Sequence, residues 1–267
     1  MSNLTKRLLT GISYVTLLLI AIMHPISTSL LFSVVAILGL SELKKICDLQ
    51  HIKFDIWPSI IIGLTTYATL IFSDIKIFLY IEIILYFISL LFQTKKNTLN
   101  LIGSTIFSTI YIFIPLALII PIGFIENDTY NYKLLFGLFI LVWSSDSWAF
   151  IFGKLFGKRK LLKKISPNKT WEGFIGSLIF TTATGYLLSL NGFELSSKAW
   201  MILGAFTSLF ATAGDLFQSM LKRAANLKDS GAILPGHGGV LDRFDSLLFC
   251  LPMYYIYFYH LNSFLNL

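Results

Sequence analysis

The chain has 267 residues, of which 55% are hydrophobic and only 13% are charged. Soluble domains carry roughly 25% charged residues, so this composition excludes a water-soluble globular domain. Several apolar runs reach the ~20 residues needed to cross a bilayer, which predicts an all-α polytopic membrane protein. Cys47 and Cys250 lie far apart and without metal-ligand spacing, so neither a disulfide framework nor a cysteine metal site is expected.

The N-terminal segment places basic residues before an apolar run, as a signal peptide does. No small-residue cleavage site precedes His24-Pro25 and more apolar runs follow, so we expect an uncleaved first helix. Proline disfavours helix in the residue before it, so the first two helices should meet at this dipeptide. Nine transmembrane helices are predicted in all, over residues 8–23, 25–41, 57–73, 75–92, 102–124, 134–153, 174–190, 199–217 and 245–265.

Lysine and arginine gather in alternate loops of this arrangement. Of the 21 basic residues, 18 fall on one side, and only Lys76, Lys133 and Lys198 fall on the other. Cytoplasmic loops are enriched in these residues, which predicts a cytoplasmic N-terminus and an outside C-terminus. The net charge of +7 therefore indicates topology, with a surplus for anionic lipid or substrate, and no nucleic-acid partner is expected.

Two inner loops, about 154–173 and 218–244, hold the dense polar chemistry. We therefore expect the active site at the cytoplasmic leaflet. Residues 1–130 are interpreted as a scaffold of transmembrane helices that could provide dimer contacts. Residues 131–267 are interpreted as the catalytic region that carries both loops.

Asp146 lies inside the predicted sixth helix, and Asp215 lies at the end of the eighth. A carboxylate at such a depth costs ~2.5–3.5 kcal/mol on insertion scales. Either one alone could be a helix-end aspartate that reaches the headgroups. Together they indicate one cavity in the cytoplasmic leaflet.

Asp242 and Asp245 open the predicted ninth helix and share one of its faces. Capping accounts for their position, because carboxylates suit the positive end of a helix. It does not account for the Gly-His-Gly-Gly turn before them. The alternative is that they are oxygen ligands for Mg²⁺, which prefers one or two carboxylates plus substrate phosphates.

Two segments have the features of phosphate sites. In SPNKTWEG (166–173), Ser166-Pro167 is predicted to begin a turn, Thr170 to cap the next helix, and Lys169 to donate to phosphate. Gly173 and Gly176 are predicted to begin a closely packed helix. The glycines at 236, 238 and 239 allow positive φ, so backbone amides around His237 could line a polyphosphate. Most lysines of GKLFGKRKLLKK are assigned to membrane anchoring instead.

These residues resemble the signature of the phosphatidate cytidylyltransferase family, also called CDP-diacylglycerol synthases. The resemblance covers about residues 141–250 and rests mainly on SMLKRAANLKDSGAILPGHGGVLDRFDS (219–246). SPNKTWEG and DSWAFIFGKLFGK (146–158) support it. One position departs from the family pattern: Gln218 stands where the family commonly has glutamate. Either metal is held less tightly here, or a surface salt bridge to Lys222 is lost.

The resemblance implies that CTP and phosphatidic acid of the inner leaflet give CDP-diacylglycerol and pyrophosphate. It further implies a homodimer. The carboxylates are suited to Mg²⁺, with room for a second cation, and the compact size of the chain favours a bacterial plasma membrane. The implied metal ligands are Asp215, Asp242 and Asp245. The implied catalytic set adds Lys222, Arg223, Arg243 and His237. The implied substrate-binding residues are Asp146, Ser166, Lys169, Thr170, Glu172, Ser219, Lys228, Asp229, Gly238 and Gly239.

Two rival functions use similar residues. Ion-coupled transporters also place carboxylates and glycine-rich breaks within membranes. Against this reading, the chain shows no internal repeat, and its polar residues lie in two loops instead of at the midplane. A CTP-dependent lipid kinase would instead transfer the γ-phosphate of CTP to an alcohol, and it would need a base for the hydroxyl group.

Overall fold

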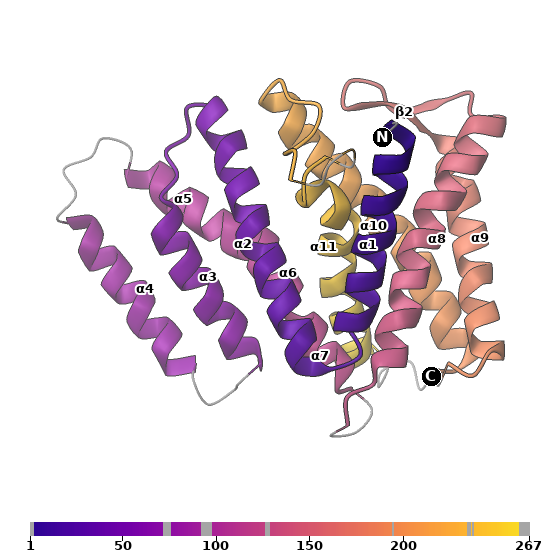
Figure 1. Ribbon diagram of the computed structural model, residues 1–267, viewed down its shortest axis with the longest axis horizontal. Helices are drawn as coiled ribbons and strands as arrows, with labels where there is room; N and C mark the ends of the chain where they lie inside the picture. Colours follow the sequence, from indigo (N-terminus) through magenta and orange to yellow (C-terminus); the bar gives the residue numbers. More distant parts are fainter. Residues whose placement is uncertain are drawn as a thin grey trace. The chain divides into compact units, whose positions relative to one another are not determined.

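The computed structural model describes residues 3–71, 76–91, 98–125, 129–193, 195–233, 236 and 238–261. Apart from one two-stranded hairpin, the regular structure in these ranges is helical (Figure 1). The first helices are α1 (Asn3–Ala21), α2 (Pro25–Leu49), α3 (Ile56–Ile71), α4 (Lys76–Leu91) and α5 (Thr98–Ser108), followed by the π-helical turn η2 (Thr109–Phe113), α6 (Ile114–Ala117) and α7 (Ile119–Gly123). The later elements are α8 (Tyr132–Phe156), β1 (Lys160–Leu162), β2 (Ser166–Thr170), α9 (Trp171–Leu190), α10 (Ser197–Ala224), α11 (Leu241–Ile256) and the π-helical turn η3 (Tyr257–Leu261).

Five helical stretches of the described chain are long and apolar enough to cross a membrane. They are Pro25–Leu49, Thr98–Gly123, Tyr132–Phe156, Trp171–Leu190 and Ser197–Ala224. Each has at least 20 residues, which at 1.5 Å per residue matches the ~30 Å hydrocarbon thickness. The chain is therefore an integral membrane protein of mainly helical fold.

The predicted helix over 102–124 is interrupted, because two prolines lie within it. The backbone passes from α5 through the π-helical turn Thr109–Phe113 into the short helices α6 and α7. Pro115 and Pro121 have no N–H to donate, so the regular hydrogen-bond ladder cannot continue through them. A π-helical turn absorbs such a local mismatch.

A hairpin replaces the loop that was expected around residues 160–170. β1 and β2 pair antiparallel, with Lys160 opposite Thr170 and Leu162 opposite Ser166. The prediction that Ser166-Pro167 begins a turn is therefore wrong, since the turn comes earlier, at residues 163–165. Proline is tolerated at the start of an edge strand, where its missing N–H removes no ladder bond.

The chain forms two compact units, neither of which is contiguous in sequence. Unit 1 contains Met1–Pro121 and Ala224–Asp242, and unit 2 contains Ile122–Arg223 and Arg243–Leu267. The segment between α10 and α11 thus packs with the N-terminal helices.

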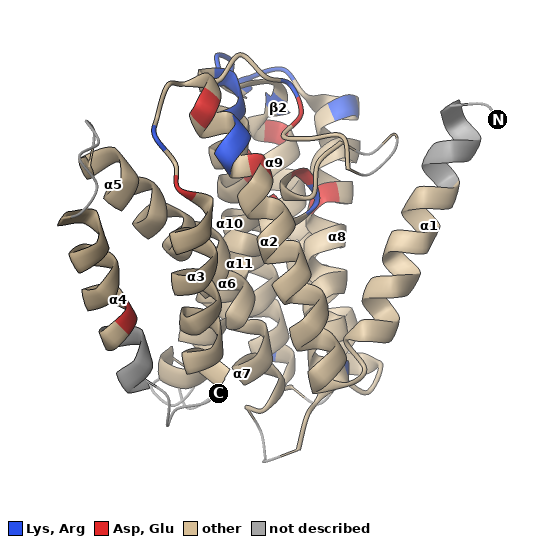
Figure 2. Cartoon of the chain, turned by 60° about the vertical axis from the view of Figure 1, so that its left-hand side comes forward, with Lys and Arg blue, Asp and Glu red and all other residues tan. Residues whose placement is uncertain are grey.

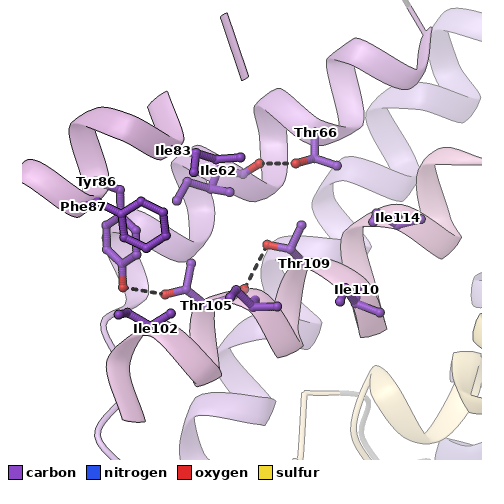
Figure 3. A pocket seen from close by; sticks show the side chains of 11 residues that line it. Ile62, Thr66, Ile83, Tyr86, Phe87, Ile102, Thr105, Thr109, Ile110 and Ile114 are labelled. Atoms are coloured by element: carbon purple, nitrogen blue, oxygen red, sulfur yellow. Dashed lines mark hydrogen bonds between the residues drawn. The ribbon is translucent and has the colours of Figure 1, made fainter. Parts of the chain in front are cut away.

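Unit 1 contains an apolar, partly open cavity of about 290 Å³ beside α3, α4, α5 and η2 (Figure 3). The hydroxyls in its wall are satisfied internally. Thr66 Oγ1 donates to Ile62 O at 2.7 Å, Thr109 Oγ1 donates to Thr105 O at 2.9 Å, and Tyr86 OH lies 3.2 Å from Thr105 Oγ1. None of the eleven lining residues carries a charge, so this cavity does not suit a phosphate ligand.

Unit 2 is held together by close packing of α8 against α9. A Cβ at Gly173 would lie 2.7 Å from the carbonyl oxygen of Ala149, and one at Gly176 would overlap the ring of Phe152. The predicted role of these two glycines in close helix packing is confirmed. A hydroxyl pair joins the same helices, with Ser145 Oγ and Ser177 Oγ 3.0 Å apart.

Candidate active site

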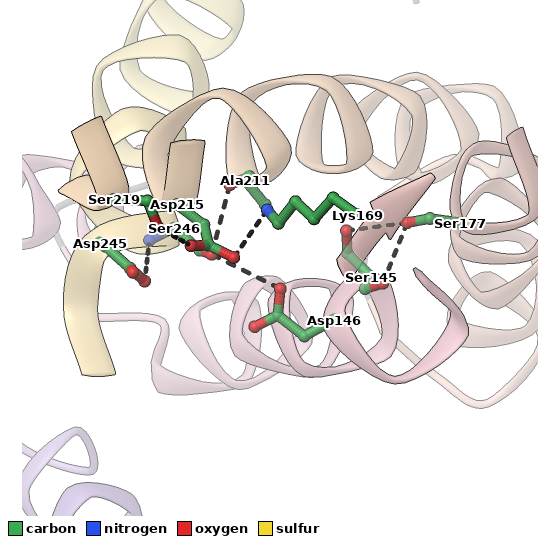
Figure 4. Close-up of polar contacts among 9 residues, drawn as sticks. All are labelled: Ser145, Asp146, Lys169, Ser177, Ala211, Asp215, Ser219, Asp245 and Ser246. Carbon is green, nitrogen blue, oxygen red and sulfur yellow. Dashed lines mark hydrogen bonds and ion pairs between the residues drawn. The ribbon is translucent and has the colours of Figure 1, made fainter. Parts of the chain in front are cut away.

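An ion pair between β2 and α10 forms the centre of the charged cluster in unit 2 (Figure 4). Lys169 Nζ lies 2.6 Å from Asp215 Oδ2, and the two side chains are 24% and 34% exposed. Local structure places the lysine: Thr170 Oγ1 accepts from Gly173 N at 3.1 Å and caps α9. The predicted cap is confirmed, and it fixes the strand-to-helix junction from which Lys169 reaches Asp215.

Two further aspartates surround this ion pair. Asp245 is only 9% exposed, and its Oδ1 accepts from Ser246 N at 2.7 Å. Asp146 lies deeper in α8 but keeps an exposed face, and Ser246 Oγ approaches its Oδ1 at 3.5 Å. Both Asp146 and Asp245 lie within electrostatic range of Asp215. Carboxylates from α8, α10 and α11 therefore converge, as predicted for Asp146 and Asp215.

Gly214 permits this convergence. A Cβ at position 214 would overlap the backbone carbonyl oxygen of Asp245 and would lie 3.3 Å from Phe249 Cβ. The absence of a side chain lets α10 and α11 touch through their backbones. Asp215, the next residue, is thereby brought near Asp245.

Cations balance the carboxylates. The positive charges of Lys169 and Arg243 attract the carboxylate of Asp146. The positive charge of Lys222, which is 8% exposed, attracts the carboxylate of Asp245. Ser219 Oγ donates to Asp215 Oδ1 at 3.2 Å. Like charges at such depth are strongly unfavourable unless opposite charges and hydrogen bonds compensate them. The cluster therefore combines oxygen ligands with fixed positive charge, the combination that a polyanion with a bound cation requires.

Figure 2 shows how these charges are placed along the helices. In unit 2, blue and red segments gather near β2 and the adjoining ends of α8 and α9, whereas most of these helices is tan. The candidate active site thus lies toward one end of the apolar helices. This agrees with a site near a membrane surface.

In unit 1, Asp242 organises the segment that leads into α11. It lies in the first turn of α11, and its Oδ2 accepts from Ser230 N at 2.9 Å and from Gly239 N at 3.0 Å. Asp242 thus lies in the first turn, as expected, but it is not the N-cap: α11 begins one residue earlier, and both donors belong to the preceding segment. Gly238 adopts φ 84°, and the neighbouring Gly236 adopts φ 79°, as predicted.

Gly239 is different, because its φ is not in the positive range that glycine alone favours. A Cβ there would overlap the Ser230 hydroxyl and the carboxylate of Glu42. Close approach of side chains, and not backbone conformation, therefore requires glycine at this position.

Sequence reasoning missed Glu42. This residue of α2 is 4% exposed, and its carboxylate accepts from Ser230 Oγ at 2.6 Å, Val240 N at 2.8 Å and Leu241 N at 2.9 Å. The sequence did contain one indication of its importance, since Glu42 is a carboxylate directly after the membrane helix predicted over 25–41. The two adjacent lysines made the segment resemble an ordinary charged helix end.

The remaining predicted residues lie in different parts of the structure. Glu172 accepts from the backbone N–H groups of Lys158, at 3.0 Å, and Arg159, at 3.2 Å, so it ties the hairpin to α9. Ser166 begins β2. Exposed side chains belong to Arg223, Lys228, Asp229 and Arg243, and His237 lies outside the described residues.

The structure also bears on Gln218, which stands where the family commonly has glutamate. Gln218 is 0% exposed and Lys222 is 8% exposed, and both lie on α10 one turn apart. A lost surface salt bridge is therefore excluded as the meaning of this departure, because neither side chain is at the surface.

A metal site can be tested against these residues. Within the described ranges, no three His, Cys, Asp or Glu side chains are close enough to hold a metal ion together. Mg²⁺ commonly binds through one or two carboxylates and completes its shell with water and substrate phosphates. Asp215 and Asp245 fit that incomplete donor set.

Carboxylates and cations thus converge in an apolar helical membrane protein, an arrangement that suits a charged substrate near a membrane surface. The model of the cytidylyltransferase family matches residues 5–261. The chain belongs to the cytidylyltransferase family, a family of nucleotidyltransferases.

Relatives from several bacteria agree. The chain is 33% identical to the phosphatidate cytidylyltransferase of Bacillus subtilis, over 96% of this chain and 97% of the relative. It is 46% identical to that of Staphylococcus aureus strain COL over 49% of this chain and 50% of the relative. It is 40% identical to that of Haemophilus influenzae over 63% of this chain and 60% of the relative.

Proposed function

We propose that this protein transfers the cytidylyl group of CTP to phosphatidic acid, releasing pyrophosphate and forming CDP-diacylglycerol for phospholipid synthesis. The observation that carries the proposal is the cluster of Lys169, Asp215, Asp146 and Asp245. Its family membership and the names of its relatives point to the same chemistry.

The reaction requires no strong general base. A phosphate oxygen of phosphatidic acid is already a nucleophile at neutral pH, and it attacks the α-phosphorus of CTP. The new P–O bond forms as the bond to pyrophosphate breaks, in line. Catalysis therefore depends on bringing two polyanions together and on stabilising charge in the transition state.

The residues of unit 2 suit these tasks. Lys169 is held by β2 and Asp215 in a fixed position, from which its ammonium can bind a phosphate oxygen. Buried Lys222 supplies a second fixed charge, and exposed Arg243 supplies a third. Ser219 and Ser246 orient the carboxylates of Asp215 and Asp146.

A divalent cation completes the proposal. Asp215 and Asp245 would hold Mg²⁺, with Asp242, one turn before Asp245 on α11, as the further ligand that the sequence indicates. Such an ion would neutralise the phosphates and stabilise the leaving pyrophosphate. A second cation would serve the same purpose.

We extend the proposal to the membrane context. The distribution of basic residues supports nine spans with the N-terminus in the cytoplasm, the C-terminus outside, and the site open to the inner leaflet of a bacterial plasma membrane. Phosphatidic acid then enters sideways, while its acyl chains remain in lipid. A homodimer is proposed on family resemblance alone.

Labelled CTP tests this function. Purified protein receives phosphatidic acid, Mg²⁺ and CTP labelled at either the α- or the γ-phosphate. Label in the lipid from α-labelled CTP, and none from γ-labelled CTP, is expected. Transfer of the γ-label would instead identify a lipid kinase, and no transfer of either label would remove the proposal.

A further inference from the structure

Glu42 is a buried carboxylate that the proposed chemistry does not use. Its three hydrogen-bond donors come from a segment 188 to 199 residues later in the chain: Ser230 Oγ at 2.6 Å, Val240 N at 2.8 Å and Leu241 N at 2.9 Å. The last two donors lie at the start of α11, where backbone N–H groups lack partners within the helix. A side chain of α2 therefore caps α11.

The surrounding backbone is shaped to this carboxylate. A Cβ at Gly231 would overlap Glu42 Oε1, and one at Gly239 would overlap both Glu42 oxygens. Gly231 has no positive φ, so its conformation would accept alanine, and the three atoms nearest to such a Cβ all belong to Glu42. Two glycines thus make room for one buried side chain.

Glu42 and Asp242 together hold Ser230 and Gly239, the two ends of the loop that precedes α11. Ser230 is shared between them, since its Oγ donates to Glu42 and its N–H donates to Asp242. At the other end, Gly239 N donates to Asp242 at 3.0 Å, while the next two N–H groups donate to Glu42. Both ends of the loop are therefore fixed by carboxylates.

We propose that Glu42 is a positioning residue for the nucleotide: it holds Ser230, residues 239–240 and the first turn of α11 in the geometry that CTP binding requires. Glu42 is 4% exposed, so it acts through the loop and not by contact with substrate. This assignment rests on the proposed function. It adds α2 to the elements on which turnover depends.

Glu42→Gln tests the assignment with little change in shape. The amide keeps one acceptor oxygen but turns an N–H₂ group toward donors, so at least one backbone N–H of α11 loses its partner. The kcat/KM for CTP is expected to fall 10- to 100-fold, while KM for phosphatidic acid changes less than twofold. Glu82→Gln is the matched control, because Glu82 is a carboxylate of α4 in the same unit that accepts from Thr65. Its kinetic constants should match those of the wild type.

Trypsin provides a readout that does not need activity. Lys228 is exposed directly before the loop, and release of the loop should accelerate cleavage after it at least tenfold in Glu42→Gln. Gly231→Ala extends the test. It should accelerate cleavage strongly in the wild type and hardly at all in a Glu42→Ala background, where the overlap is removed.

The outcomes separate the two proposals. Wild-type protein that transfers no cytidylyl group, but whose cleavage responds as described, would end the proposed function and leave the loop restraint standing. Glu42→Gln protein with unchanged kcat/KM and unchanged cleavage would overturn the positioning role. The positioning role would also be overturned if kcat/KM fell equally for CTP and phosphatidic acid, and only in proportion to the loss of folded protein. If Glu42→Gln does not fold, Ser230→Ala decides: a 3- to 10-fold fall in kcat/KM for CTP is expected, and no change refutes the role.

Discussion

The ion pair between Lys169 and Asp215 allows a test that separates stability from catalysis. Replacing Lys169 with methionine keeps most of the length of the side chain and removes its charge. Asp215 then stays within range of Asp146 and Asp245 without its ammonium partner. Both stability and turnover should fall, but for different reasons.

The expected loss of stability follows from the exposure of the pair. Exposed pairs contribute about 0.2–1 kcal/mol, and removal of one partner from a buried pair costs about 3–5 kcal/mol. With side chains 24% and 34% exposed, this pair lies between these limits, at about 2 kcal/mol. For a chain of this size that lowers the apparent Tm by about 4–8 °C. Turnover should fall by about 10²–10³, the usual effect of removing one preorganised donor to a transition state.

The double variant Lys169→Met/Asp215→Asn distinguishes the two effects. With no unpaired carboxylate left, its apparent Tm should recover toward the wild type, whereas its turnover of α-labelled CTP should stay lost. Lys44→Met is the control, because Lys44 and Asp48 form an exposed i,i+4 pair on α2, and its loss should cost about 0.5 kcal/mol or less. Wild-type turnover of Lys169→Met, or stability losses that add in the double variant, would refute this reasoning.

Three further expectations follow from the same geometry. Asp242→Asn retains one acceptor oxygen for its backbone donors, so turnover should fall by at least about 10³ with little change in apparent Tm; normal turnover would remove the proposed metal ligand. Gly214→Ala should destabilise the protein by about 1–3 kcal/mol through overlap with Asp245 O, whereas Gly103→Ala, with open space around it, should be neutral or stabilising in thermal unfolding. Removal of divalent cations by EDTA should stop label transfer and leave the fold intact in circular dichroism, with activity restored by Mg²⁺; activity that survives EDTA would contradict the metal proposal.

The sequence was most informative where one local rule decides the structure. Long apolar runs can bury their backbone only as helices in a membrane, so the main helices were predictable. The cap at Thr170 and the positive φ of Gly236 and Gly238 follow from residue chemistry and were also predicted correctly. Asp146 and Asp215 were recognised because a charge within an apolar helix needs a reason.

What could not be predicted depends on contacts between distant segments. Glu42 receives its donors from residues nearly 200 positions later, and no local pattern reveals such a partner. Gly214 and Gly239 are required by backbone and side chains that approach from other elements. The hairpin at 160–170 was missed because a proline and four basic residues mask a strand pattern only a few residues long.

The central claim, transfer of a cytidylyl group to phosphatidic acid, is tested most directly by identifying the products. Purified protein in detergent micelles is given CTP, Mg²⁺ and phosphatidic acid, and both lipid and nucleotide products are analysed by mass spectrometry. One CDP-diacylglycerol for each pyrophosphate is expected, and both should disappear in Lys169→Met. Formation of CDP with a newly phosphorylated lipid, or no conversion of CTP at all, would contradict the claim.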